Sequence, residues 1–183
     1  DFKWGWNKWG WKDPRNTFTL PLWSEIYPNA KILYIYRHGI DVSLSLLRRS
    51  SDRFLNEKEL FIKRRTIGIE QKKEGFVDSA RCLNLEDCFQ LWIEYMSAAQ
   101  KLIEIMPDRI LPIKYEELLI YPDDIMNSIF KYLNINVGKY LLNNLIEYIN
   151  QDHAYSYLNQ NYSKLVTKEN IKVLNKFGYT LKT

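Results

Sequence analysis

The chain has 183 residues, of which 46% are hydrophobic and 15% aromatic, and its formal net charge is +4. This length and apolar content are enough for one substantial core, so we expect a single globular domain over residues 1–183. The modest charge fits a small anionic ligand as well as a weak nucleic-acid surface and does not choose between them. No apolar run approaches the roughly 20 residues of a membrane span, so no transmembrane segment is predicted.

The cysteine pattern argues against a metal centre. Cys82 and Cys88 are six residues apart, with no neighbouring cysteine or histidine to complete a ligand set. We therefore predict neither a metal site nor a disulfide framework, and a reduced, cytoplasmic setting is favoured.

The first part of the chain is predicted to form a strand, a helix and a second strand. Tryptophans with period-2 spacing predict a short strand or extended lip within residues 1–16, with a turn at Pro14. Residues 17–27 have helical spacing and end at Pro28. The apolar run at residues 32–36 predicts a central parallel strand buried on both faces.

The next helix is expected to carry a polar stripe of Asp41, Ser45 and Arg48 that faces away from the core. The charged, irregular residues 51–80 are interpreted as a helical excursion with a mobile loop. Apolar periodicity then predicts, in order, a helix at 85–106, a strand at 109–114, and helices at 123–133, 138–149 and 167–177. This order of elements favours an α/β fold with a parallel sheet flanked by helices.

The junction between the strand at 32–36 and the following helix predicts an anion site. Arg37 offers a fixed fork of donors, the helix offers free N-terminal amides and the positive end of its dipole, and Ser45 adds a hydroxyl. His38 is interpreted as a cap of the helix start. We therefore expect a phosphate site at the end of this strand.

Three blocks in order resemble the sulfotransferase family, whose members move a sulfuryl group from 3'-phosphoadenosine 5'-phosphosulfate (PAPS) to an acceptor. Residues 9–15 (WGWKDPR) are similar to the lysine-containing active-site turn of bacterial-type members. Arg37 and Ser45 are eight residues apart, as in the family's signature for the 3'-phosphate. Residues 113–118 (IKYEEL) resemble a segment whose tyrosine lies near the adenine. Residues 165–179 also resemble the closing helix of bacterial members.

The resemblance implies a P-loop-NTPase-like parallel sheet, with PAPS as co-substrate and no metal. Nothing from Asp1 to Trp11 resembles the family's 5'-phosphosulfate-binding loop, which holds its ligand through backbone amides and a basic side chain. We therefore expect the C-terminal portion of a sulfotransferase domain, incomplete at its N-terminus. Such a portion should bind the donor poorly on its own.

The resemblance also implies roles for single residues. Lys12 is expected to stabilise charge on the leaving or equatorial oxygens, Arg37 and Ser45 to bind the 3'-phosphate, and Tyr115 to lie near the adenine. Each role has a structural alternative. Lys12 is alternatively a surface lysine on a turn, and Arg37 an arginine paired with a carboxylate. Ser45 is alternatively a small residue in a helix contact, and Tyr115 a tyrosine at the core edge.

The catalytic base has no direct counterpart, since Pro14 and Trp11 stand where family members carry a histidine or a glutamate. Asp13 is the nearest carboxylate, and it either accepts the proton, if burial raises its pKa, or caps the following turn. Arg15 either contacts the acceptor or donor or forms a structural ion pair. Trp11 is a candidate for acceptor binding, because tryptophans stack on sugars and other flat molecules, although we favour a core role for the tryptophans.

The leading hypothesis is a PAPS-dependent sulfotransferase that acts on a hydroxyl or amine of a small-molecule or carbohydrate acceptor. The alternative is a catalytically inactive nucleotide-binding or scaffold module. A single-stranded nucleic-acid binder would also use tryptophans and basic side chains, but the chain lacks a repeated basic-aromatic pattern, so nucleic acid is not an expected partner. The sequence predicts no oligomeric state.

Overall fold

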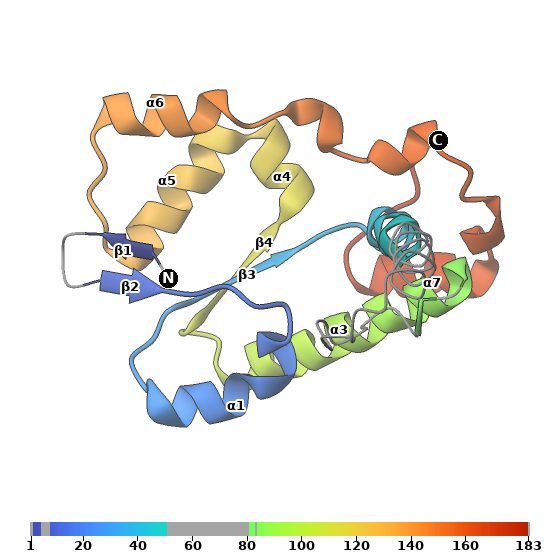
Figure 1. Cartoon of the computed structure of the whole chain (residues 1–183), viewed down its shortest axis with the longest axis horizontal. Coiled ribbons are helices and arrows are strands. Elements are labelled where there is room, and N and C mark those ends of the chain that lie inside the picture. Colours follow the sequence, from blue (N-terminus) through green and yellow to red (C-terminus); the bar gives the residue numbers. More distant parts are fainter. Residues whose placement is uncertain (1, 5–7, 51–80, 83, 183) are drawn as a thin grey trace, which may run out of the picture.

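The computed structural model describes residues 2–4, 8–50, 81–82 and 84–182. The helical excursion expected over residues 51–80 lies outside the described residues. The elements in chain order are β1 (Phe2–Trp4), β2 (Lys8–Gly10), α1 (Asn16–Ile26), β3 (Ile32–Tyr36), a helix over residues 39–50, α3 (Leu85–Ile105), β4 (Ile110–Lys114), α4 (Tyr115–Ile120), α5 (Pro122–Leu133), α6 (Lys139–Glu147), the 3-10 turns η2 (Gln151–His153), η3 (Ser156–Asn159) and η4 (Ser163–Leu165), and α7 (Lys168–Lys176) (Figure 1).

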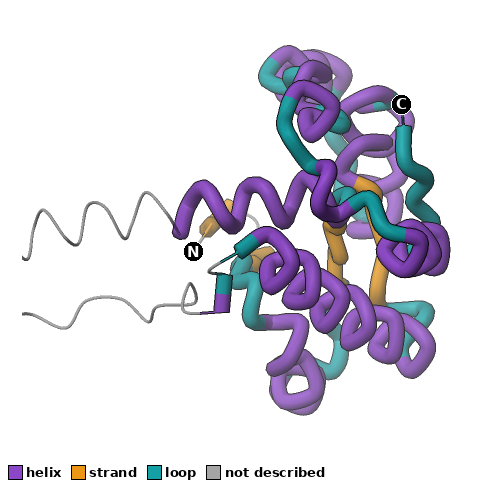
Figure 2. Tube along the Cα trace, turned by 90° about the vertical axis from the view of Figure 1, so that its right-hand side faces the viewer, coloured by secondary structure: helices purple, strands orange, loops and turns teal. Residues whose placement is uncertain are grey.

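The central feature is a parallel pair formed by β3 and β4, whose register runs from Ile32 opposite Ile110 to Tyr36 opposite Lys114. β1 and β2 form a separate antiparallel hairpin. Helices lie on either side of the parallel pair (Figure 2). The α/β class and the parallel pairing predicted from the sequence are confirmed. Because β3 and β4 run in the same direction, the residues after both strands lie at one edge of the sheet.

The core forms around α3. Asn84 caps this helix by accepting a hydrogen bond from the backbone N–H of Asp87, and Glu86 and Asp87 favour the positive end of its dipole. One face of the helix is buried, as its apolar spacing predicts. The core cluster joins this face to the helix at 39–50 and to the C-terminal segment, and its buried members are Ile40, Leu85, Phe89, Trp92, Met96, Tyr157, Leu165, Leu174, Phe177 and Tyr179.

The burial expected for both faces of β3 is wrong on one face. Ile35 is 51% exposed. Tyr34 and Tyr36, on the opposite face, stack on each other with ring centroids 5.4 Å apart and pack against the core cluster. Among the described residues β3 pairs only with β4, so this small sheet has one well-covered face and one less covered face.

Gly39 allows the helix over residues 39–50 to begin against α3. A Cβ added to Gly39 would lie 2.8 Å from Cε2 of Phe89 and 2.8 Å from Cε3 of Trp92. Gly39→Ala is therefore expected to lower the free energy of unfolding by about 1–3 kcal/mol through overpacking. Urea denaturation measures this, with Gly138→Ala as control, because nothing lies within 4 Å of a Cβ at Gly138. Equal stability of the two variants would contradict the close packing.

Candidate active site

Arg37 lies directly after β3, at the carboxyl edge of the parallel pair. Its Nη2 donates hydrogen bonds to the carbonyl oxygen of His153 at 3.0 Å and to Oγ of Ser156 at 2.9 Å. The same nitrogen lies 3.2 Å from Oδ1 of Asp41. The guanidinium carbon lies 5.1 Å from the ring centroid of Tyr115, the first residue after β4. The structure therefore brings together two of the predicted donor-binding residues, Arg37 and Tyr115.

The start of the helix at 39–50 is capped from within the chain. Nδ1 of His38 accepts a hydrogen bond from the N–H of Ile40 at 3.3 Å, which confirms the predicted cap. The N–H of His38 donates to Oε1 of Glu116 at 2.8 Å. These two amides are already bonded, so the anion site expected here has fewer free backbone donors than the sequence indicates. Arg37 becomes its main positive group.

Ser45 lies on the same helix and is half-buried. In the described part of the chain, no hydrogen bond joins its side chain to Arg37. Its role at the 3'-phosphate stays a prediction.

The polar stripe expected to face away from the core is wrong at Asp41, whose side chain is only 1% exposed. Two contacts explain this burial. Asp41 forms an i,i+4 ion pair with Arg37, and its Oδ1 accepts a hydrogen bond from the Ser156 hydroxyl at 2.7 Å. A buried carboxylate needs such partners, because an unpaired charge in the interior is strongly unfavourable.

Glu116 ties the ends of the two strands to the C-terminal segment. It is fully buried and accepts hydrogen bonds from the N–H of His38 and, at 3.1 Å, from the hydroxyl of Tyr179. Burial raises the pKa of Glu116 and that of Tyr179. Burial lowers the pKa of His38 to about 4, and its ring stacks on Tyr157 with centroids 4.5 Å apart. His38 is therefore neutral at pH 7 and adds no charge to the site.

The neutral state of His38 makes stability depend on pH. Since its folded pKa of about 4 lies below the ordinary 6.5, the unfolded chain binds the proton first as the pH falls, and stability is lost between pH 6.5 and 4. The expected loss at pH 4.5 is roughly 2 kcal/mol. Burial of Glu116 acts in the opposite direction, because the folded chain then binds that proton more readily.

Urea unfolding at pH 7 and pH 4.5 separates the two contributions when the wild type is compared with His38→Asn. Asparagine keeps a helix-capping oxygen and does not titrate. The variant is expected to lose less stability than the wild type over this range. The same pH dependence in both proteins would contradict a buried neutral histidine.

The turn before α1 holds the other predicted site residues. Lys12 is exposed. Arg15 forms an ion pair with Asp13, with Nη2 and Oδ2 2.6 Å apart, and the Arg15 N–H donates to Oδ1 of Asp13 at 2.9 Å. The carbonyl oxygen of Asp13 accepts from the N–H of Asn16 at 3.0 Å. The structure thus contains the ion pair and the turn contacts that were the structural alternatives for Arg15 and Asp13.

Asp13 does not meet the condition set for a general base. Its side chain is 30% exposed, and its hydrogen bonds from Arg15 lower its pKa to about 2. A carboxylate with so low a pKa has little tendency to accept a proton near neutral pH. The structure therefore favours a turn-forming role for Asp13.

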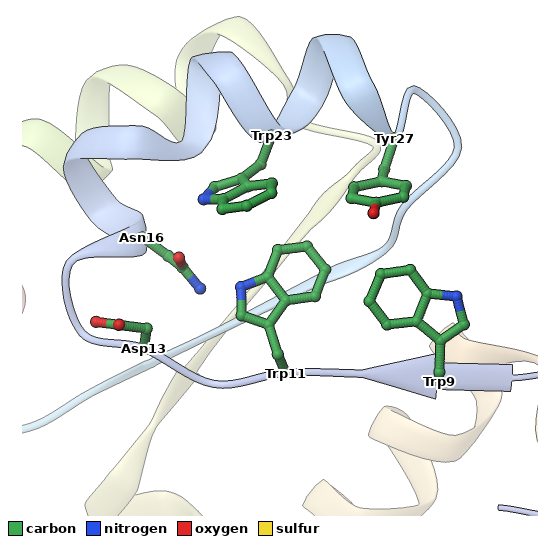
Figure 3. A pocket seen from close by; sticks show the side chains of 6 residues that line it. All are labelled: Trp9, Trp11, Asp13, Asn16, Trp23 and Tyr27. Carbon is green, nitrogen blue, oxygen red and sulfur yellow. The ribbon is translucent and has the colours of Figure 1, made fainter. Parts of the chain in front are cut away.

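Two of the predicted core tryptophans are exposed instead. Trp9 is 57% and Trp11 38% exposed, and their rings stack with centroids 5.4 Å apart. Trp9 packs edge-on against Tyr27, the residue after α1, and Trp11 against Trp23 of α1, each pair with ring centroids 5.1 Å apart. Together these rings line an open hollow of about 310 Å³ (Figure 3). Asp13 and Asn16 line the end of this hollow where the chain turns into α1. A core role is therefore wrong for Trp9 and Trp11. The role of Trp11 in acceptor binding stays a prediction.

A model of the sulfotransferase family matches residues 2–138. The chain belongs to the sulfotransferase family. The matched range includes the blocks at 9–15, 37–45 and 113–118, and it ends before residues 165–179, whose resemblance to the closing helix stays a prediction. Searches of curated proteins and of solved structures gave no match. The general chemistry of this family is sulfuryl transfer, which is an electrostatic and positioning task like phosphoryl transfer.

Three observations bear on membrane, metal and disulfide sites. In the described ranges, no helix is both long and apolar enough to cross a membrane. The same ranges contain no cluster of three or more histidine, cysteine or acidic side chains suited to a metal ion. Cys82 and Cys88 are buried free thiols.

Three residues that contact Arg37 or His38 at the end of β3 were not predicted as part of the site: Asp41, Glu116 and Ser156. The i,i+4 spacing of Arg37, just before the helix at 39–50, and Asp41, in its first turn, was a usable signal for their ion pair. Glu116 was noticed only as part of a motif. Ser156 is 119 residues from Arg37, and no local pattern indicates their contact.

Proposed function

We propose that this chain holds the 3'-phosphate end of PAPS and belongs to an enzyme that transfers the sulfuryl group to a hydroxyl or amine of an acceptor. The observation that carries the proposal is the position of Arg37. Its guanidinium lies at the carboxyl edge of a parallel sheet, against the ring of Tyr115. Ligands of open α/β sheets bind at this edge, and an arginine fork matches the geometry of a phosphate.

We further propose that β3 and β4 are two strands of a P-loop-NTPase-like sheet and that residues 1–183 belong to one sulfotransferase domain. In the reaction, the acceptor oxygen or nitrogen bonds to sulfur while the bond from sulfur to the 5'-phosphate oxygen breaks. The acceptor proton goes to a base, and the products are the sulfated acceptor and 3',5'-bisphosphoadenosine.

The proposed roles follow from charge and position. Arg37 and Ser45 hold the 3'-phosphate, and Tyr115 lies beside the adenine. Lys12, which is exposed on its turn, stabilises negative charge on the leaving or equatorial oxygens. Arg15 fixes the shape of that turn through Asp13.

The acceptor is proposed to bind at the aromatic hollow that contains Trp11. The exposed rings of Trp9 and Trp11 offer apolar surface, and Asp13 and Asn16 offer polar groups at one end. A small molecule or a sugar with one apolar face and hydroxyls at its rim fits this combination. Lys12 follows Trp11 directly, so an acceptor bound there would stand next to the proposed catalytic turn.

The test is isothermal titration of the full-length protein with 3',5'-bisphosphoadenosine and with 5'-AMP, which lacks the 3'-phosphate. A 3'-phosphate site predicts clearly tighter binding of the bisphosphate. Equal affinities would contradict the proposal.

A catalytically inactive nucleotide-binding module is the second candidate, and the low pKa of Asp13 favours it because the turn then lacks an obvious base. Release of 3',5'-bisphosphoadenosine from PAPS in the presence of an acceptor panel would support the enzyme. Tight nucleotide binding without such release would support the inactive module.

A further inference from the structure

We propose that Asp41 and Ser156 are positioning residues that hold the Arg37 guanidinium ready for the 3'-phosphate. This inference rests on the proposed function, in which Arg37 binds that phosphate. It adds a contribution from the C-terminal segment, since Ser156 lies beyond residues 2–138 that match the family.

The contacts of Arg37 converge on a single nitrogen. Nη2 meets the carbonyl oxygen of His153, the hydroxyl of Ser156 and Oδ1 of Asp41, at 3.0, 2.9 and 3.2 Å. Nε is buried, and no described residue is bonded to it. Nη1 likewise has no hydrogen bond to the described part of the chain. The protein therefore fixes one corner of the guanidinium and leaves Nη1 as the donor for a ligand.

Arg37, Ser156 and Asp41 form a chain of two hydrogen bonds in which each donor is defined. The Ser156 hydroxyl donates its proton to Oδ1 of Asp41 at 2.7 Å, so its lone pairs face Nη2 of Arg37. Oδ2 of Asp41 is buried, and no partner for it exists among the described residues. A buried carboxylate with one unpartnered oxygen adds little to stability, but it constrains the cation that it touches.

The segment that carries Ser156 is itself anchored in the core. Tyr155 has a positive φ of 54°, which turns the chain into η3. Tyr157 is fully buried, stacks on His38 and accepts a hydrogen bond from the N–H of Lys182 at 2.9 Å. Ser156 is therefore held in place from both sides, as a positioning residue must be.

The experiment compares affinities for 3',5'-bisphosphoadenosine and 5'-AMP in the full-length protein, in Asp41→Asn and in Ser156→Ala. We expect the preference for the bisphosphate to fall about tenfold in Asp41→Asn and about fivefold in Ser156→Ala. The affinity for 5'-AMP should stay within about twofold, which general misfolding would not allow. The matched controls Asp152→Asn and Ser163→Ala, both at exposed positions nearby, should keep the wild-type preference.

The inference is overturned if Asp41→Asn and Ser156→Ala keep the wild-type preference for 3',5'-bisphosphoadenosine over 5'-AMP. This holds even if the affinities for both nucleotides fall by the same factor. A stronger preference in Asp41→Asn also overturns it, because Asp41 would then only compete with the phosphate. If the wild type itself shows no preference, the proposed function fails first. The two failures are therefore distinguishable.

Discussion

Arg37→Ala is expected to lower the affinity for 3',5'-bisphosphoadenosine by about a hundredfold, because charge-assisted bonds from one guanidinium to a phosphate are lost together. The effect should be specific to the bisphosphate, since 5'-AMP lacks the 3'-phosphate that Arg37 is proposed to bind. Isothermal titration at fixed, low salt measures both affinities, because exposed charges are screened as the ionic strength rises.

Two variants make this result interpretable. Arg48→Ala removes an exposed cation from the helix at 39–50, which follows Arg37, and should leave the affinity nearly unchanged. Arg37→Lys keeps the charge next to buried Asp41 but loses the planar fork, and an intermediate loss of about tenfold is expected. If Arg48→Ala weakened binding as much as Arg37→Ala, general electrostatic attraction would explain the binding and the local site would not.

Lys12→Ala is expected to lower kcat for sulfuryl transfer by about 10²–10³, the usual effect of losing one group that stabilises transition-state charge. The affinity for 3',5'-bisphosphoadenosine should fall much less than kcat, because the product keeps the leaving oxygen but carries neither the sulfuryl oxygens nor the charge that develops in the transition state. Initial rates with saturating PAPS, together with product titration, separate these quantities.

The control for Lys12 is Lys101→Ala, which removes an exposed lysine from α3. Its kcat should equal that of the wild type. An equal kcat in Lys12→Ala and wild type would remove Lys12 from the catalytic turn and leave it as a surface lysine.

The sequence predicted most of the elements because their patterns are local. The strand at 32–36 agrees with β3, and the helix expected at 85–106 ends one residue earlier, at Ile105. Apolar periodicity, Asn84 as a cap and Pro107 as a stop were sufficient for α3. The parallel pairing of β3 with β4 followed from the order of strands and helices.

The predictions that failed depend on which segments meet in space. Asp41 looked like a surface residue because its helical spacing matched that of Ser45 and Arg48, and only Ser156 and Arg37 explain its burial. Trp9 and Trp11 were expected in a core around the strand missing at the N-terminus, yet they are exposed at the hollow. Local patterns carry no information about contacts over such distances in the chain.

The most direct measurement is a crystal structure of the protein with bound 3',5'-bisphosphoadenosine. We predict the 3'-phosphate within hydrogen-bond distance of the Arg37 guanidinium and the Ser45 hydroxyl, with the adenine beside Tyr115 and with Asp41 and Ser156 still in contact with Nη2. A bisphosphate bound away from the carboxyl edge of β3 and β4, with Arg37 contacting only Asp41, His153 and Ser156, would contradict this account.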